Sequence, residues 1–127
     1  MAALLARIVR EQGRDAEAQA LCEAAEHASA ADDLEAQALW RMVRAPIAAR
    51  AGDVAQAEAW AREAVEFAQR TEAPVLQGDA LAELAAVLRL AGKTDEAAQA
   101  AAEAVALFTA KGNAVAAARA AALMAVA

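Results

Sequence analysis

The sequence predicts an all-α protein, and three observations lead to that prediction. Alanine, the residue with the highest helix propensity, fills 46 of the 127 positions. Tyrosine is absent and only two tryptophans and two phenylalanines are present, so residues that favour strands are scarce. Apolar residues also recur at helical spacing on both sides of Gly13, Gly52 and Gly92, which follow one another at intervals of 39 and 40 residues. Together these features predict repeated pairs of helices.

We predict seven helices, which run in chain order over about 2–12, 14–30, 33–51, 53–71, 74–91, 93–111 and 113–126. The first, third and fifth helices end at Gly13, Gly52 and Gly92, because glycine readily adopts the left-handed backbone that closes a helix. Gly112 and Asn113 separate the last two helices in the same way.

Three helix starts carry signals of their own. Asp32 or Asp33 can cap the third helix, because a carboxylate accepts hydrogen bonds from the free N–H groups of a first turn. Pro74 suits the first turn of the fifth helix, where a missing N–H costs nothing. Thr94 or Asp95 can cap the sixth helix.

The helices group into three repeats and a closing helix. The repeats span about 2–31, 33–72 and 74–111, and helix 113–126 closes the array. No linker interrupts them, so residues 1–127 are expected to form a single domain. Alignment on the three glycines brings small residues into columns: Ala18, Ala57 and Ala97, then Cys22, Ala61 and Ala101, then Ala25, Ala64 and Ala104. Their spacing of four and three places them on one stripe of a helix.

Pro46 disturbs the third predicted helix, because it removes a backbone donor and clashes with the preceding turn. Compared with their counterparts in the next repeat, Trp40 and Val43 are displaced by one residue. A bulge near Pro46 returns both to the core side, and we prefer this interpretation. The alternative is a plain kink, with Arg41 and Arg44 at the core-side positions.

The composition argues against two classes of partner and indicates a cellular compartment. The formal net charge of −6 argues against nucleic acid and anionic membranes as partners. The apolar start is interrupted by charge from Arg7 onward, so neither a signal peptide nor a membrane span is expected there. The single Cys22 cannot form an internal disulfide, which favours a reducing cytoplasm.

No group of residues with catalytic spacing is present, so we expect no enzyme activity, no cofactor and no metal. His27 and Cys22 are single residues of their kind, and Cys22 aligns with buried alanines. Glu63 and Glu66 are interpreted as solvent-facing charges. Trp40 and Trp60 are expected to fill the core, because rings at helical spacing usually do so.

An alanine stands seven residues before each glycine, and a small-residue stripe follows each turn. This layout resembles the tetratricopeptide repeat over nearly the whole chain, although that repeat has a period of about 34 residues. The strings LAELAAVLRLAGKTDEAAQAAAEAVALF and KGNAVAAARA are similar to the C-terminal tetratricopeptide region of large actinobacterial signalling proteins with nucleotide-cyclase-like or ATPase domains upstream. The resemblance implies a right-handed superhelix of antiparallel helix pairs, and a regulatory or scaffolding fragment without an active site.

Charge is unequally divided between the two helices of each repeat. The helices before each glycine are rich in arginine, and those after it carry most of the acids. The resemblance implies that the former line a concave face. We therefore predict a groove for a protein or peptide partner, acidic because arginine pairs well with carboxylates, formed by Arg7, Arg10, Arg41, Met42, Arg50 and Arg89. The alternative is that these arginines only solubilise alanine-rich helices.

The ends of the array suggest a second kind of partner. Repeat arrays need polar terminal faces, and helix 113–126 has one charged residue. A self-associating structural unit, most simply a homodimer, is therefore the alternative function. The predicted residues of that interface are Val115, Arg119, Leu123 and Met124.

Overall fold

The computed structural model describes residues 33–122, and within that range it is all-helical without a strand. Its helices are α3 (Leu34–Arg50), α4 (Val54–Gln69), α5 (Pro74–Leu90), α6 (Thr94–Ala110) and α7 (Ala114–Ala122). Each begins and ends within one or two residues of its prediction, as far as Ala122. The predicted helices 2–12 and 14–30 and the end of helix 113–126 lie outside the described residues. The described part therefore contains five helices and does not show the predicted seven-helix superhelix.

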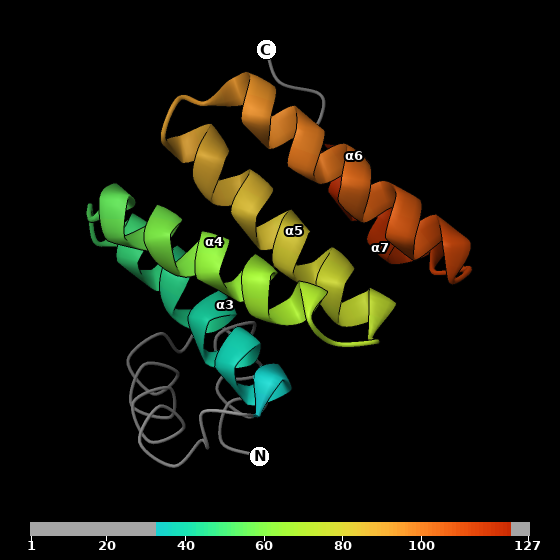
Figure 1. Cartoon of the computed structure of the whole chain (residues 1–127). Coiled ribbons are helices and arrows are strands. Elements are labelled where there is room, and N and C mark those ends of the chain that lie inside the picture. Colours follow the sequence, from blue (N-terminus) through green and yellow to red (C-terminus); the bar gives the residue numbers. More distant parts are fainter. Residues whose placement is uncertain (1–32, 123–127) are drawn as a thin grey trace.

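Consecutive helices form antiparallel hairpins. The most extensive contacts join α3 to α4 and α5 to α6, and smaller interfaces join α4 to α5 and α6 to α7. The first helices of the two hairpins, α3 and α5, also touch one another. In Figure 1, α4 and α6 lie toward the viewer with α5 between them, while α3 and α7 lie behind their partners. This arrangement is a two-layer stack of helix pairs.

Alanine forms much of the interface between the helices. The predicted stripes are confirmed in α4 and α6, where the aligned alanines have no exposed surface: Ala57, Ala61, Ala64, Ala97, Ala101 and Ala104. Small side chains let helix axes approach closely, and larger residues such as Leu88 and Phe108 fill the remaining space. One cluster of buried residues extends from Ala38 in α3 to Ala120 in α7. The first copy of the stripe, at Ala18, Cys22 and Ala25, lies outside the described residues.

The same turn ends α3, α5 and α6. Gly52, Gly92 and Gly112 have φ angles of 94°, 79° and 72°, as expected for residues that close a helix. At the first of these turns, the N–H of Gly52 donates to the carbonyl of Ala49, and the next N–H donates to the carbonyl of Ala48. The other two turns have the equivalent pair of bonds. This is the Schellman arrangement, which satisfies carbonyls at the helix end. Gly13 lies outside the described residues.

The residue after each glycine also begins the next helix. Asp53 Oδ1 accepts from the N–H of Gln56 at 3.2 Å, and Asn113 Oδ1 accepts from the N–H of Ala116 at 3.1 Å. At the Gly92 turn this position belongs to Lys93, which provides no side-chain cap for α6. The prediction that Thr94 or Asp95 caps this helix is therefore wrong, because the turn geometry places both inside the first turn.

Two other predicted helix starts are confirmed. Asp33 caps α3, where its Oδ1 accepts from the N–H of Ala36 at 3.1 Å. Pro74 is the first residue of α5. The connection before it has no glycine, and Thr71 holds it instead, because its hydroxyl donates to the carbonyl of Ala68 at 2.6 Å.

The expected bulge near Pro46 is wrong, because α3 is α-helical without interruption from Leu34 to Arg50. Trp40 and Val43 are nevertheless buried, with 4% and 0% of their surfaces exposed. No shift of register is needed, since most of the circumference of α3 in this stretch is covered. Arg41 and Arg44 remain partly buried beside these residues.

None of the helices between residues 33 and 122 combines the length and the hydrophobicity that a membrane crossing requires.

Candidate functional site

Arginine and aromatic side chains alternate between α3 and α4. We call the six residues the arginine–aromatic row, which comprises Arg70, Phe67, Arg41, Trp40, Arg44 and Trp60 in spatial order. Guanidinium groups lie 4.1–5.8 Å from the neighbouring ring centroids, within the range of cation–π attraction. The two tryptophan rings also meet edge to face, with centroids 6.4 Å apart.

Arg41 occupies the middle of the row and joins the two helices. Its guanidinium lies 4.1 Å from the centroid of Trp40 and 4.5 Å from that of Phe67. Its Nε donates to Glu63 Oε1 at 2.9 Å, and its Nη1 donates to the carbonyl and the side-chain oxygen of Gln37. Only 15% of its side chain is exposed. Arg41 therefore acts as a clamp between α3 and α4, and most of its hydrogen-bonding edge is already used.

Arg44 lies between Trp40 and Trp60 in the row. Its guanidinium is 4.3 Å from the centroid of the half-buried Trp60 and 5.8 Å from that of Trp40. Both distances are within the range of cation–π attraction. The two rings thus restrict the position of the Arg44 side chain beside the cleft.

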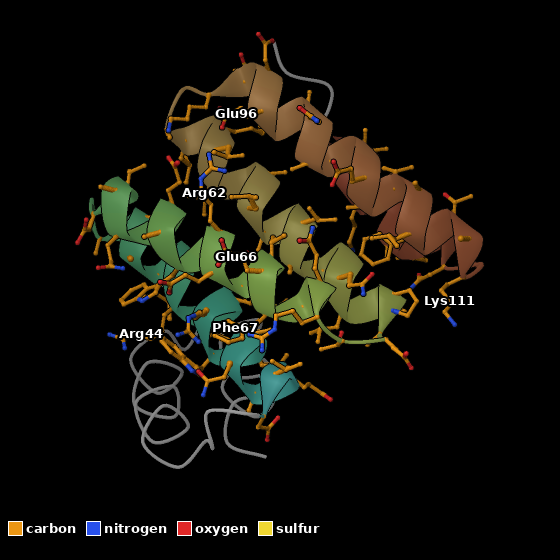
Figure 2. All side chains as sticks on the ribbon, viewed as in Figure 1. Arg44, Arg62, Glu66, Phe67, Glu96 and Lys111 are labelled. Atoms are coloured by element: carbon orange, nitrogen blue, oxygen red, sulfur yellow. The ribbon has the colours of Figure 1, made fainter. Side chains whose placement is uncertain are left out.

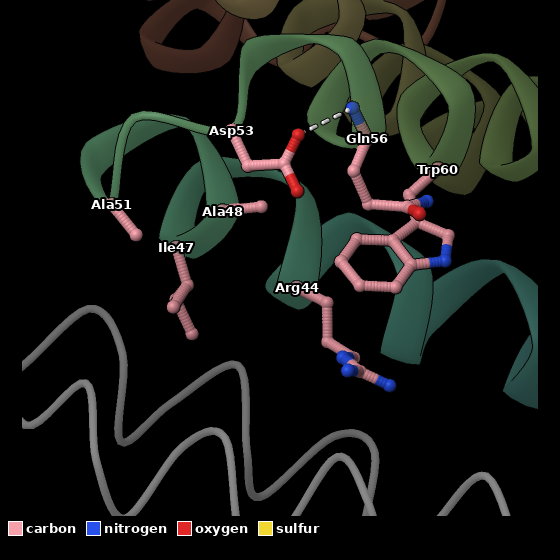
Figure 3. Close-up of a pocket in the computed structure, with 7 residues that line it drawn as sticks. All are labelled: Arg44, Ile47, Ala48, Ala51, Asp53, Gln56 and Trp60. Atoms are coloured by element: carbon pink, nitrogen blue, oxygen red, sulfur yellow. Dashed lines mark hydrogen bonds between the residues drawn. The ribbon is translucent and has the colours of Figure 1, made fainter.

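A cleft of about 190 Å³ opens beside Arg44, between the second half of α3 and the start of α4. Figure 3 shows the residues that line it, which are Arg44, Ile47, Ala48, Ala51, Asp53, Gln56 and Trp60. The α3 side is largely apolar, and Trp60 adds an aromatic wall. Asp53 is committed to the cap of α4. The cleft can therefore accept an apolar side chain beside a charged group that faces Arg44.

The structure divides the predicted groove. Arg7 and Arg10 lie outside the described residues, and Arg41 is the clamp described above. Met42 is only 1% exposed and belongs to the core cluster, so its assignment to a groove is wrong. Arg50 and Arg89 lie exposed in the last turns of α3 and α5.

Two of the four predicted self-association residues, Val115 and Arg119, lie within the described residues. Val115 is 66% exposed and Arg119 is also exposed on α7. Leu123 and Met124 lie outside the described residues, so the interface stays a prediction.

Trp60, Phe67 and Arg44 were not predicted as a group. One signal in the sequence was available, since Trp60 and Phe67 stand seven residues apart and share one face of α4. The interpretation of Glu63 as a solvent-facing charge is incomplete, because its side chain is 47% exposed and its carboxylate also pairs with Arg41 across the hairpin. The pairing depends on how α3 and α4 are rotated against each other, which spacing within one helix does not show.

Residues 33–122 contain no group of three or more His, Cys, Asp or Glu side chains arranged to hold a metal ion. His27 and Cys22 lie outside that range. The chain matches no protein-family model, and no curated protein matches it.

Proposed function

We propose that this chain is a non-catalytic protein-interaction module of the tetratricopeptide type, and that it binds an acidic peptide segment in the cleft between α3 and α4. It acts as a regulatory or scaffolding part of a larger signalling protein. The proposed binding site is the cleft rather than the predicted groove, because two rings contact Arg44 there beside an apolar wall.

The contact of the Arg44 guanidinium with two aromatic rings beside the cleft is the observation that supports this proposal. An arginine whose orientation is already restricted loses less side-chain freedom when it meets a carboxylate. Ile47, Ala48 and Trp60 next to it offer apolar surface to a neighbouring side chain of the same peptide. Charge and apolar surface together favour a short segment in which a carboxylate and an aliphatic residue are adjacent.

Tryptophan fluorescence provides the test, because Trp60 lines the cleft. A synthetic peptide of alternating Glu and Leu is titrated into the protein, and a peptide of alternating Lys and Leu serves as the comparison. We expect a saturable change with the acidic peptide only. Arg44→Gln should weaken binding by about ten-fold or more, as expected for the loss of a hydrogen bond to a charged group.

Two further variants make this result specific. Arg119→Gln removes the same charge from α7, which packs on α6, and should leave the affinity unchanged. Arg50→Gln combined with Arg89→Gln tests the exposed part of the predicted groove. If this pair abolishes binding while Arg44→Gln has no effect, the cleft is not the site.

The second candidate is self-association through α7, which the exposure of Val115 supports. Because isolated exposed valines are common on protein surfaces, the oligomeric state itself must be measured. Sedimentation of the protein should show a concentration-dependent dimer that Val115→Glu removes. A monomer at all concentrations, with or without the substitution, would exclude this candidate.

A further inference from the structure

Four charged side chains connect the second helices of the two described repeats. Arg62 of α4 donates to Glu58 at 2.9 Å and to Glu96 of α6 at 2.7 Å. Lys93, which immediately precedes α6, donates to Glu58 at 2.9 Å. We call these four residues the α4–α6 ion-pair cluster. Figure 2 shows Arg62 and Glu96 pointing toward one another from α4 and α6.

The cluster is a direct polar connection between these helices. Each of α4 and α6 packs on α5, whereas their backbones have at most marginal contact with one another. Within residues 33–122, the ion pairs of the cluster are the polar bonds that join α4 to α6 and its first turn. The two helices are therefore positioned by their packing on α5, and the four charged side chains bridge them directly.

A groove of about 350 Å³ runs between α4 and α6 beside the cluster. Its floor is apolar and includes Leu81, Leu84 and Leu88 of α5, each less than a tenth exposed. Arg62 and Glu96 both line the groove, and their ion pair spans it. Loss of that pair removes this bridge between the walls.

The exposure of the cluster makes it sensitive to salt. The side chains of Arg62, Lys93 and Glu96 are 45%, 47% and 57% exposed, so dissolved ions reach them. The screening length falls from about 30 Å at 0.01 M salt to about 3 Å at 1 M. Exposed pairs are individually weak, but here several act on the same two helices.

We propose that the α4–α6 ion-pair cluster is an electrostatic latch that sets the spacing between successive helix pairs. At low ionic strength it holds α4 and α6 together across the groove. As salt rises, the latch weakens, the spacing increases and the leucine floor becomes accessible. The proposal is independent of binding at the α3–α4 cleft.

Spin-label distance measurements test the latch. The labels are attached at Gln69→Cys and Glu103→Cys, which lie on opposite walls of the groove, in the full chain with Cys22→Ser. We expect a narrow distance distribution at about 0.01 M salt and a longer, broader one at about 1 M. The double substitution Arg62→Gln and Lys93→Gln should give the broad distribution at both salt concentrations.

Arg89→Gln is the matched control, because it removes a positive charge from an exposed residue of α5 outside the cluster. It should keep the salt response of the parent protein. A parent distribution that does not change with salt would overturn the proposal, and so would a double variant that keeps the full response. If the double variant loses helical circular dichroism, the salt series on the parent still decides.

Discussion

Gly78 is a buried residue in α5, and the ring of Phe108 from α6 lies against it. A Cβ atom added at Gly78 would lie 2.7 Å from Cε1 of that ring and 2.9 Å from Cζ. Phe108 is only 2% exposed, so the ring cannot move aside into solvent. We therefore predict that Gly78→Ala destabilises the protein, although alanine is the better helix former.

Two opposing effects give the magnitude. Alanine in place of glycine within a helix contributes about 1 kcal/mol to stability. One additional carbon atom in a closely packed core costs about 1–3 kcal/mol. The expected net effect is a loss of up to about 2 kcal/mol in the free energy of unfolding.

Urea unfolding followed by circular dichroism measures this loss, and a second background identifies its cause. Phe108→Leu replaces the ring that faces Gly78 with a shorter side chain, so that the methyl group added at position 78 no longer contacts it. In that background Gly78→Ala should stabilise the protein by up to about 1 kcal/mol, which reverses the sign. Equal stabilisation in both backgrounds would refute the reasoning, because Phe108 would then not restrict position 78.

Three further substitutions have predicted outcomes. Lys93→Asn should raise the free energy of unfolding by up to about 1 kcal/mol in urea unfolding, because Asn supplies the missing cap of α6 and only an exposed ion pair is lost. Asp53→Ala should lower it by about 1 kcal/mol in the same assay, because the cap of α4 is lost. Glu58 has a pKa below its ordinary value of 4.5, chiefly because Lys93 and then Arg62 hydrogen-bond to its carboxylate. Its contribution to stability is therefore present above that value and is lost as the pH falls through the lowered pKa. The stability difference between the parent and Glu58→Gln, from urea unfolding over a pH series, should shrink below pH 4.5 and stay constant near neutrality.

The helix boundaries could be predicted because their signals are local. Glycines with a left-handed backbone close α3, α5 and α6. At the start of α3, the carboxylate of Asp33 caps the helix that follows it directly. The cap of α6 could not be predicted from residue preference alone. The Schellman turn places the residue after the glycine at the N-cap position of the next helix, and this geometry selects Lys93 over Thr94 and Asp95.

The candidate site depends on contacts between helices, and its prediction was correspondingly poorer. The sequence indicated that the helices before each glycine are rich in arginine, which led to Arg41 and Arg50. It did not show that Arg41 reaches Glu63, which is 22 residues away, or that Trp60 lies beside Arg44. Such pairs depend on the rotation of α3 about its axis relative to α4. In an interface formed largely by alanine, only a few large side chains determine that rotation.

At Lys93, the residue that would best stabilise α6 alone differs from the residue that connects α6 to the preceding helix pair. At the equivalent position, Asp53 and Asn113 cap the helices that they precede, whereas Lys93 places a positive charge at the N-terminus of α6, where the helix dipole disfavours it. A missing cap costs about 1 kcal/mol, and an exposed ion pair such as that with Glu58 contributes about 0.2–1 kcal/mol. The stability of α6 alone therefore does not account for lysine at this position. The connection to Glu58 on α4 does account for it, since lysine can reach the previous repeat and a capping side chain cannot.

The Lys93→Asn variant should accordingly be more stable and yet lose part of the salt-dependent spacing between α4 and α6. If it gained stability and kept that response unchanged, Lys93 would not belong to the latch.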